Sequence, residues 1–302
     1  MASDKATKFN ISYAQYGEDV IIGSLLDGVR KGFYVDVGSN YPTTDSVTAA
    51  FYKSGWHGIN IEPIEFLYRE LLRDRPRDIN INCGAGSSES KVILRQYTGA
   101  HGHSTMVDTR KALNPSEDFV DVEVAIMPLR HILEKYKVNK IDFMKIDVEG
   151  YEAEVIKGND WRKFRPQVIC IEANLAAMDW RTILEKADYR IFLFDGLNEY
   201  YVADESWEIT EGFSERVVAA SHSTLKYGQA LIFDDLKKQA ELKDKNIAAR
   251  ETERKAMEEI IIDLRESQRL SMHGRSFSQR LLRCAYGLTV DWLRYKFSDR
   301  RK

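Results

Sequence analysis

The chain has 302 residues, of which 43% are hydrophobic, 30% charged and 11% aromatic, with 6 Pro and 18 Gly. This composition excludes a collagen-like, low-complexity or wholly disordered chain. The length suffices for one large domain with an appendage, or for two ordinary domains. The formal net charge of −3 hides an asymmetry, because residues 272–302 contain eight Lys or Arg and two Asp, which leaves 36 basic and 45 acidic residues in the rest of the chain.

The distribution of charge and hydropathy bears on the location of the protein and on the kind of partner that it binds. An acidic body argues against nucleic acid as a partner, whereas a basic tail with interleaved aromatic residues suits an anionic surface. No apolar run approaches the roughly 20 residues that span a bilayer, and residues 1–10 lack the apolar centre of a secretory signal. Cys83, Cys170 and Cys284 form neither a disulfide framework nor a zinc motif. We therefore expect a cytoplasmic protein, with possible attachment to the inner face of the membrane.

Seven short apolar runs that alternate with helical patterns predict βα units on a mostly parallel sheet. The last two runs are joined by Gly196-Leu197-Asn198, which is too short for a crossover helix and predicts an antiparallel hairpin. The predicted strands are Gly32–Gly38, Gly58–Glu62, Ile79–Cys83, Ile141–Asp147, Val168–Glu172, Arg190–Asp195 and Glu199–Ala203.

Helical patterns lie before and between these strands, so the sequence predicts an α/β domain over residues 1–233 with helices on both faces of its sheet. Glycine or proline ends two of the predicted helices. The predicted helices are Glu18–Val29, Ser46–Ser54, Glu65–Arg75, Tyr151–Lys157 and Ala177–Ala187.

A long helical extension is predicted to follow this domain. Residues 234–271 contain neither Gly nor Pro and are predicted to form one long charged helix, or a coiled coil that would make the protein a homo-oligomer. Charged and polar residues interrupt its heptad seam, which keeps both possibilities open. Residues 272–302 form a basic amphipathic tail, of which 275–302 are a candidate for peripheral contact with anionic lipid.

Ligands of an open parallel sheet bind beyond the carboxyl ends of its strands, so candidate site residues are sought there. The first strand ends in Asp36-Val37-Gly38-Ser39-Asn40, which has one of the three glycines of the dinucleotide motif G-x-G-x-x-G. A pyrophosphate ligand is therefore disfavoured. Glu62, which ends the second strand, can accept the two ribose hydroxyls of a nucleoside. The third strand ends in small residues, Cys83-Gly84-Ala85-Gly86, against which a flat base can lie.

Carboxylates gather after the fourth and fifth strands, where Asp147, Glu149, Glu172 and the amide of Asn174 are expected around one crevice. Like charges held close together raise a pKa or require a cation. A general base, a metal ligand and a partner for a sulfonium group are all open roles for them, and a solvated acidic rim is the alternative without function.

Five motifs follow one another along the chain: Gln15-Tyr16-Gly17-Glu18-Asp19, residues 32–40, Gly55-Trp56 with Asn60-Ile61-Glu62-Pro63, residues 142–150, and Asp195-Gly196-Leu197-Asn198. In these motifs, and over about residues 12–236, the chain resembles the FkbM-type S-adenosylmethionine-dependent methyltransferases. The resemblance implies a class I (Rossmann-like) methyltransferase fold and O-methylation, commonly of sugar hydroxyls in bacterial surface polysaccharides. A glycan or glycolipid acceptor is accordingly expected. Asn40 stands where class I methyltransferases usually have a second glycine.

The resemblance also implies roles for individual residues toward S-adenosylmethionine. Asp36 and Gly38, with Asn40 nearby, would hold its methionine end, and Glu62, followed by Pro63, would bind its ribose. Asn82, Gly84 and Ala85 would flank the adenine. The pocket would be closed from the N-terminal segment by Gln15, Glu18 and Asp19.

The general base for an unactivated alcohol has four candidates in the sequence, and Asp147 is favoured over Glu149, Glu172 and His103. A Mg²⁺ site built from Asp147, Glu172 and Asn174, as in catechol-type methyltransferases, is a less favoured alternative that the family does not require. Two other functions stay open. One is a nicotinamide-dependent sugar oxidoreductase on a similar sheet, and the other is a non-catalytic oligomerising scaffold.

Overall fold

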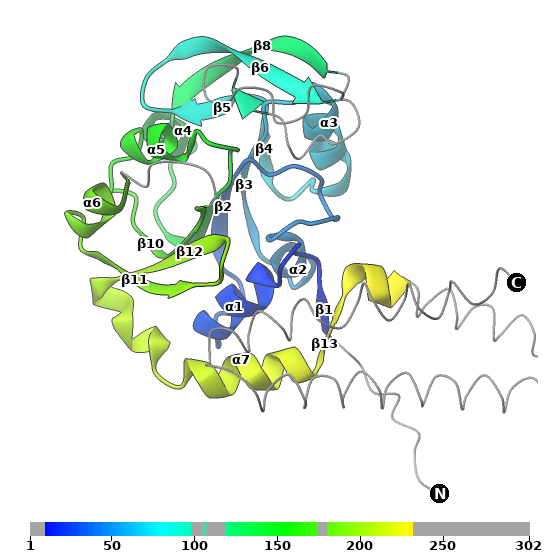
Figure 1. The fold of residues 1–302 in the computed structure, drawn as a ribbon, viewed down its shortest axis with the longest axis vertical. Helices are drawn as coiled ribbons and strands as arrows, with labels where there is room; N and C mark the ends of the chain where they lie inside the picture. The colour runs from blue at the N-terminus through cyan, green and yellow to red at the C-terminus, as the bar shows by residue number, and fades with distance from the viewer. Residues whose placement is uncertain (1–9, 98–104, 107–118, 174–179, 232–302) are drawn as a thin grey trace, which may run out of the picture. The chain divides into compact units, whose positions relative to one another are not determined.

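A seven-stranded sheet forms the centre of residues 25–213 in the computed structural model (Figure 1). The structure describes residues 10–97, 105–106, 119–173 and 180–231. They divide into two compact units, one within residues 25–213 and the other made of residues 10–24 and 214–231. The predicted helix at 234–271 and the basic tail at 272–302 lie outside the described residues, so their boundaries and roles stay predictions.

The central sheet contains all seven predicted strands, and their ends agree with the prediction to within two residues. Its order is β11-β12-β10-β9-β2-β3-β4. Neighbours among β10, β9, β2, β3 and β4 run parallel, whereas β12 is antiparallel to both β10 and β11, which confirms the predicted hairpin. The strands are β2 (Phe33–Val37), β3 (His57–Ile61), β4 (Ile79–Ile81), β9 (Ile141–Ile146), β10 (Pro166–Glu172), β11 (Tyr189–Phe194) and β12 (Asn198–Ala203).

Helices cover both faces of this sheet, since the residues of its inner strands are buried on both sides. Val35, Ile59 and Met144 and their neighbours on one face pack against α4 (Leu129–Lys135), α5 (Glu152–Lys157) and α6 (Trp180–Glu185). On the other face Phe143 packs against Phe51 of α2 (Ala49–Lys53) and against Trp56. The described part of α6 is shorter than its prediction, α2 begins three residues later than predicted, and α4 was not predicted.

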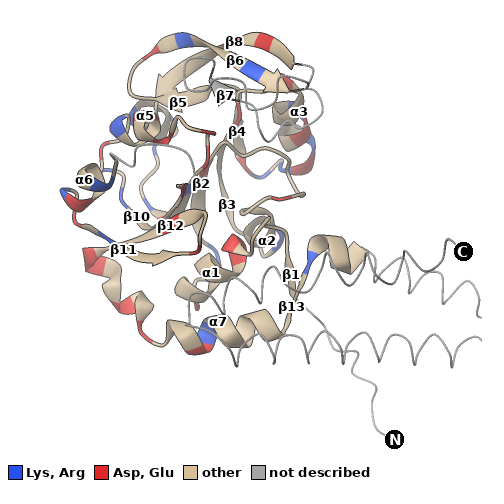
Figure 2. Cartoon of the chain, viewed as in Figure 1, with Lys and Arg blue, Asp and Glu red and all other residues tan. Residues whose placement is uncertain are grey.

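A second sheet of four strands, which the sequence analysis did not predict, packs on α3 (Glu65–Asp74). Its order is β5-β8-β6-β7, with β5 (Gly84–Gly86), β6 (Ser90–Tyr97), β7 (Thr105–Met106) and β8 (Phe119–Pro128). The shared core is apolar and contains Ile64, Leu67, Leu94, Val124 and Ile126. On the outer face, ion pairs join Lys91 to Glu123 and Arg95 to Asp121, and Figure 2 shows these opposite charges on β6 and β8.

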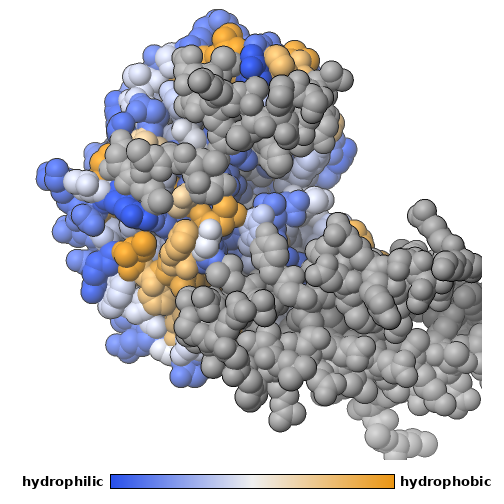
Figure 3. Space-filling model, viewed as in Figure 1, coloured by the Kyte–Doolittle hydropathy of each residue, from blue (hydrophilic) through white to orange (hydrophobic). Residues whose placement is uncertain are grey.

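The edge strand β11 carries apolar surface. Ile191 is 50% and Phe194 47% exposed, and Figure 3 shows this part of the molecule as hydrophobic. The ladder between β11 and β12 has a bulge between Ile191 and Leu193. A bulge disfavours the addition of a further strand, so it protects this edge against pairing with another chain. The 3₁₀ helix η3 (Asp204–Thr210) follows β12.

A buried arginine holds together the loop after β2. The Arg75 side chain is 3% exposed and donates to the carbonyl of Pro42, to Ser46 Oγ and to Tyr34 Oη. Asp78, which is also buried, lies 3.4 Å from its guanidinium. Such a pair is costly to break, because removing one charge leaves the other buried without its partner.

Replacing Arg75 by methionine is therefore expected to lower the free energy of unfolding by about 3 kcal/mol. Urea unfolding followed by circular dichroism measures this loss. Arg73→Met is the matched control, since Arg73 pairs with Glu70 and Asp74 on the surface, and it should leave the midpoint nearly unchanged. Equal midpoints for the two variants would contradict a structural role for the Arg75 network.

The other unit contains β1 (Asn10–Ser12), α1 (Glu18–Leu25), α7 (Phe213–His222) and β13 (Thr224–Lys226), with β1 parallel to β13. Helix α1 ends four residues before the predicted Val29. None of the helices in the described residues is both long and apolar enough to cross a lipid bilayer.

Candidate functional site

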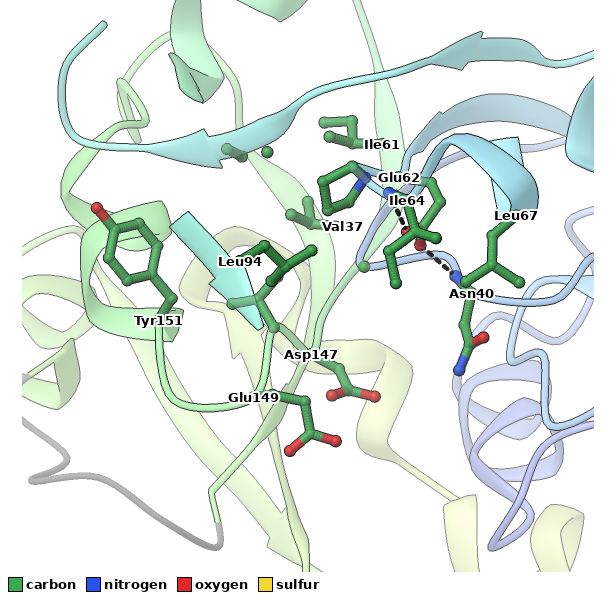
Figure 4. A pocket seen from close by; sticks show the side chains of 15 residues that line it. Val37, Asn40, Ile61, Glu62, Ile64, Leu67, Leu94, Asp147, Glu149 and Tyr151 are labelled. Carbon is green, nitrogen blue, oxygen red and sulfur yellow. Dashed lines mark hydrogen bonds between the residues drawn. The ribbon is translucent and has the colours of Figure 1, made fainter. Parts of the chain in front are cut away.

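A pocket opens at the carboxyl ends of β2, β3 and β9, the edge at which the sequence predicts a ligand (Figure 4). It contains about 620 Å³ of space, part of it open to solvent. Apolar and acidic side chains share its wall. The lining residues are Val37, Gly38, Asn40, Ile61, Glu62, Pro63, Ile64, Leu67, Gly84, Ala85, Leu94, Asp147, Val148, Glu149 and Tyr151.

Gly38 forms a tight turn directly after β2, beside the end of β3. Its φ is +76°, a region that favours glycine, and its amide donates to the carbonyl of Ile61. A Cβ at this position would lie 1.9 Å from the carbonyl oxygen of Asp147, so no other residue fits without moving the end of β9. This turn leaves bare backbone facing the pocket, which is what close approach of a ligand requires.

Glu62 ends β3 with its carboxylate in the pocket wall. The side chain is buried, and its two oxygens accept the amides of Ile64 (2.9 Å) and Asn40 (2.8 Å), as Figure 4 shows. Burial raises the pKa of Glu62 to about 7, although both amide hydrogen bonds favour the ionised form. A carboxylate has about four acceptor positions, so two remain for the hydroxyls of a ligand.

A ligand that donates hydroxyl hydrogens to Glu62 is expected to bind more tightly as pH rises through 7. The ionised carboxylate is the better acceptor, and with a pKa of about 7 its fraction grows about 10-fold between pH 6 and 8. Titration calorimetry with S-adenosylmethionine at these two pH values measures the change. Glu62→Gln, which cannot titrate, corrects for protonation of the ligand itself, and an equal pH dependence in both proteins would contradict the role.

The other residues predicted to hold a cofactor lie around the same edge. Asn40 has a φ of +54°, and its Oδ1 is buried without a hydrogen-bond partner among the described residues. Pro63, Gly84 and Ala85 line the pocket itself. Asn82 lines an adjoining groove and donates from Nδ2 to the carbonyls of Glu62 and Pro63, both at 3.0 Å, so it supports this loop.

Asp36 is predicted to hold the methionine end of the cofactor, and this role stays a prediction. It is not among the described residues that line the pocket, and it is buried with its Oδ2 accepting from Thr48 Oγ1 at 2.7 Å. Burial raises the pKa of Asp36, while the Lys145 ammonium and the Thr48 hydrogen bond act in the opposite direction. The contacts of Asp36 therefore support the strand end from behind.

Three carboxylates converge at the ends of β9 and β10. Asp147, Glu149 and Glu172 each bring an oxygen within 4.8 Å of the others, and Figure 4 shows the first two side by side. Burial and the charges of Asp147 and Glu149 raise the pKa of Glu172 to about 9. The cluster can therefore hold a proton or bind a cation, which are two of the roles predicted for it. Mg²⁺ binding stays a prediction, because Asn174 lies outside the described residues.

Sequence reasoning missed two residues that shape this site. Lys145, one residue before the end of β9, places its Nζ 2.7 Å from the carbonyl oxygen of Gly38 and 3.2 Å from Asp147 Oδ2. Glu152 accepts the amides of Val148 and Gly150, which fixes the loop that carries Glu149. An acidic residue close to a strand end is visible in sequence, but its role in closing a loop is not.

The remaining predicted residues lie either outside the described residues or outside the unit that contains the pocket. His103 lies outside the described residues. Gln15, Glu18 and Asp19 belong to the other unit, where Asp19 accepts Ser12 Oγ and the amide of Tyr13, and Glu18 accepts the amide of Tyr16. Their part in the site stays a prediction.

Comparisons with known proteins agree with the resemblance seen in sequence. The model of a family described as the methyltransferase FkbM domain matches residues 36–191. The chain is similar to a crystal structure of methyltransferase FkbM from Methylobacillus flagellatus KT, with 18% sequence identity and a TM-score of 0.39. That alignment covers 57% of this chain and 44% of the other, so less than half of the other chain's length is spanned. No curated protein matches the chain.

Proposed function

Because the chain belongs to the FkbM methyltransferase family, we propose that it moves a methyl group from S-adenosylmethionine to a hydroxyl oxygen of a sugar, in a glycan or glycolipid. The observation that carries this proposal is that one pocket is lined by the Gly38 turn, by the carboxylate of Glu62 and by Asp147 and Glu149, two members of a cluster of three carboxylates. The sugar itself is an expectation from the family resemblance.

The residues present fit the cofactor. Gly38 lines the pocket with backbone alone, and the buried Oδ1 of Asn40, which has no hydrogen-bond partner among the described residues, is an acceptor at the same pocket. Glu62 keeps acceptor positions for the ribose, and Ile61, Ile64 and Leu67 supply an apolar wall for a base. When bound, S-adenosylmethionine supplies an electrophilic methyl group on a positively charged sulfur.

The protein's own contribution is to orient the acceptor hydroxyl and to remove its proton. Asp147 is 36% exposed at the pocket and is the best placed of the carboxylates to accept that proton. In this role Asp147 would take up the hydroxyl proton of the acceptor, while the bound cofactor would supply the methyl group and keep the electron pair of its carbon–sulfur bond. Glu149 and Glu172 lie beside Asp147 and are the second choices for this role.

The local structure disfavours the nicotinamide alternative. In dinucleotide-binding folds, the glycine turn leads directly into a helix whose N-terminus holds the pyrophosphate. Here α2 begins at Ala49, eleven residues after Gly38, and acidic side chains from other loops line the pocket beside the turn. A negatively charged pyrophosphate would be repelled by Asp147 and Glu149.

The deciding experiment is calorimetric titration of the full chain with S-adenosylmethionine, with NAD as control ligand and Glu62→Ala as control protein. Binding that is specific for S-adenosylmethionine and weaker in the variant supports the proposal and directs the search to acceptor sugars. Binding of NAD alone would favour the oxidoreductase, and no detectable binding of either ligand would favour the non-catalytic scaffold.

A further inference from the structure

Lys145 carries its charge in a largely buried position, where burial disfavours the charged form of the side chain. Its side chain is only 10% exposed, and it projects from β9 directly opposite Asp36 in the parallel register between β9 and β2. Burial opposes the charge, but the carboxylates of Asp147 and Asp36 outweigh this effect and raise the pKa of the ammonium. Lys145 is therefore charged at any physiological pH, and the fold has arranged partners for it.

The partners of Lys145 belong to both functional parts of the proposed site, the turn that would face the cofactor and the carboxylate cluster. Its Nζ lies 2.7 Å from the Gly38 carbonyl oxygen, 3.2 Å from Asp147 Oδ2 and 3.7 Å from Asp36 Oδ1. That Asp36 oxygen has no hydrogen-bond partner among the described residues, so the ammonium is its compensating charge. One group thus touches the turn that would face the cofactor and the carboxylate proposed as general base.

We propose that Lys145 is a positioning residue that fixes the Gly38 turn and the Asp147 carboxylate relative to each other. One buried ammonium would then determine the positions of both the cofactor and the base. This inference rests on the proposed function. Its backbone context supports it, because the Gly38 amide is held by Ile61 and the Asp147 amide by the carbonyl of Val37. Lys145 adds a contact to the carbonyl oxygen of Gly38 and one to the carboxylate of Asp147.

A merely structural Lys145 would do no more than neutralise Asp36, and a double-mutant cycle separates the two roles. The four proteins are wild type, Lys145→Met, Asp36→Asn and the double variant. Each is measured for its unfolding temperature and for its dissociation constant for S-adenosylhomocysteine, a ligand that needs no turnover. Asp36→Asn removes the charge that Lys145 balances and keeps an oxygen that Thr48 can donate to.

Lys145→Met is expected to lower the unfolding temperature by about 10 °C, because it leaves Asp36 charged and buried. It should also weaken S-adenosylhomocysteine binding by about 10–100-fold, the range for a lost hydrogen bond to a charged group. In the Asp36→Asn background the loss of unfolding temperature should largely disappear, while the loss of binding should persist.

Two results would overturn the inference. Binding that recovers together with unfolding temperature in the double variant would make Lys145 only a counterion of Asp36. Unchanged binding in Lys145→Met would do the same. Failure of the wild type to bind S-adenosylhomocysteine would be a different result, because it would remove the proposed function and the inference with it.

Discussion

The Asp147→Asn variant is expected to transfer methyl groups about 10²–10⁴-fold more slowly than the wild type, with its dissociation constant for S-adenosylmethionine changed only a few-fold. Asparagine keeps the shape of the side chain and an oxygen that can still accept from Lys145 Nζ, which lies 3.2 Å from Asp147 Oδ2. It cannot take up the acceptor's proton, so the loss should fall on the rate of the chemical step.

The measurement is single-turnover transfer of a labelled methyl group to an acceptor, with the enzyme in excess. Asp121→Asn is a suitable control, since Asp121 pairs with Arg95 on the outer face of the second sheet and should retain the wild-type rate. A rate for Asp147→Asn within threefold of wild type would contradict the assignment and move the base to Glu149 or Glu172.

Replacing Gly38 by alanine is expected to abolish detectable binding of S-adenosylmethionine, a loss of at least 100-fold. The new Cβ would meet the carbonyl oxygen of Asp147 at 1.9 Å, so the ends of β2 and β9 must separate and the pocket wall must change shape. Positive φ adds strain of about 1–2 kcal/mol for a residue with a side chain.

Gly55→Ala isolates the clash from the strain. Gly55 also has a positive φ, of +95°, but a Cβ there meets no atom within 4 Å. Both variants should therefore lose some stability in thermal unfolding, and calorimetry should find binding lost only in Gly38→Ala. Equal binding by the two variants would show that the Gly38 turn does not face the ligand.

The central sheet is predictable because its strands are buried on both faces and read as short, continuous apolar runs between breaks. The second sheet escaped prediction although β8 contains a clear signal, since Val122, Val124 and Ile126 alternate with charged or small residues. Such alternation marks a strand with one face buried and one exposed, as found here. A search restricted to apolar runs does not detect it.

The candidate site divides in the same way. Glu62, Gly38 and the carboxylates after β9 and β10 are predictable, because parallel strands bring their carboxyl ends to one edge. The role of Lys145 could not be predicted, because the sequence around a lysine in a strand does not show which residues it will pair with. Its partnership with Asp36 comes from a register between strands more than 100 residues apart in the chain. For Asp36, the motif after the first strand predicts contact with a ligand, whereas the contacts that the structure shows are with other residues of the protein.

The insertion of β12 between β10 and β11 sets a lower limit on any shortened version of this protein. The family match ends at residue 191, inside β11, so a fragment cut there would lack β12 altogether. Strand β10, whose Val168, Ile169 and Ile171 are fully buried, would then present an unpaired hydrophobic edge to solvent. Such an edge is a template for aggregation. The pocket and the strand that covers the edge of β10 are thus encoded far apart, and the minimal unit must extend through Ala203.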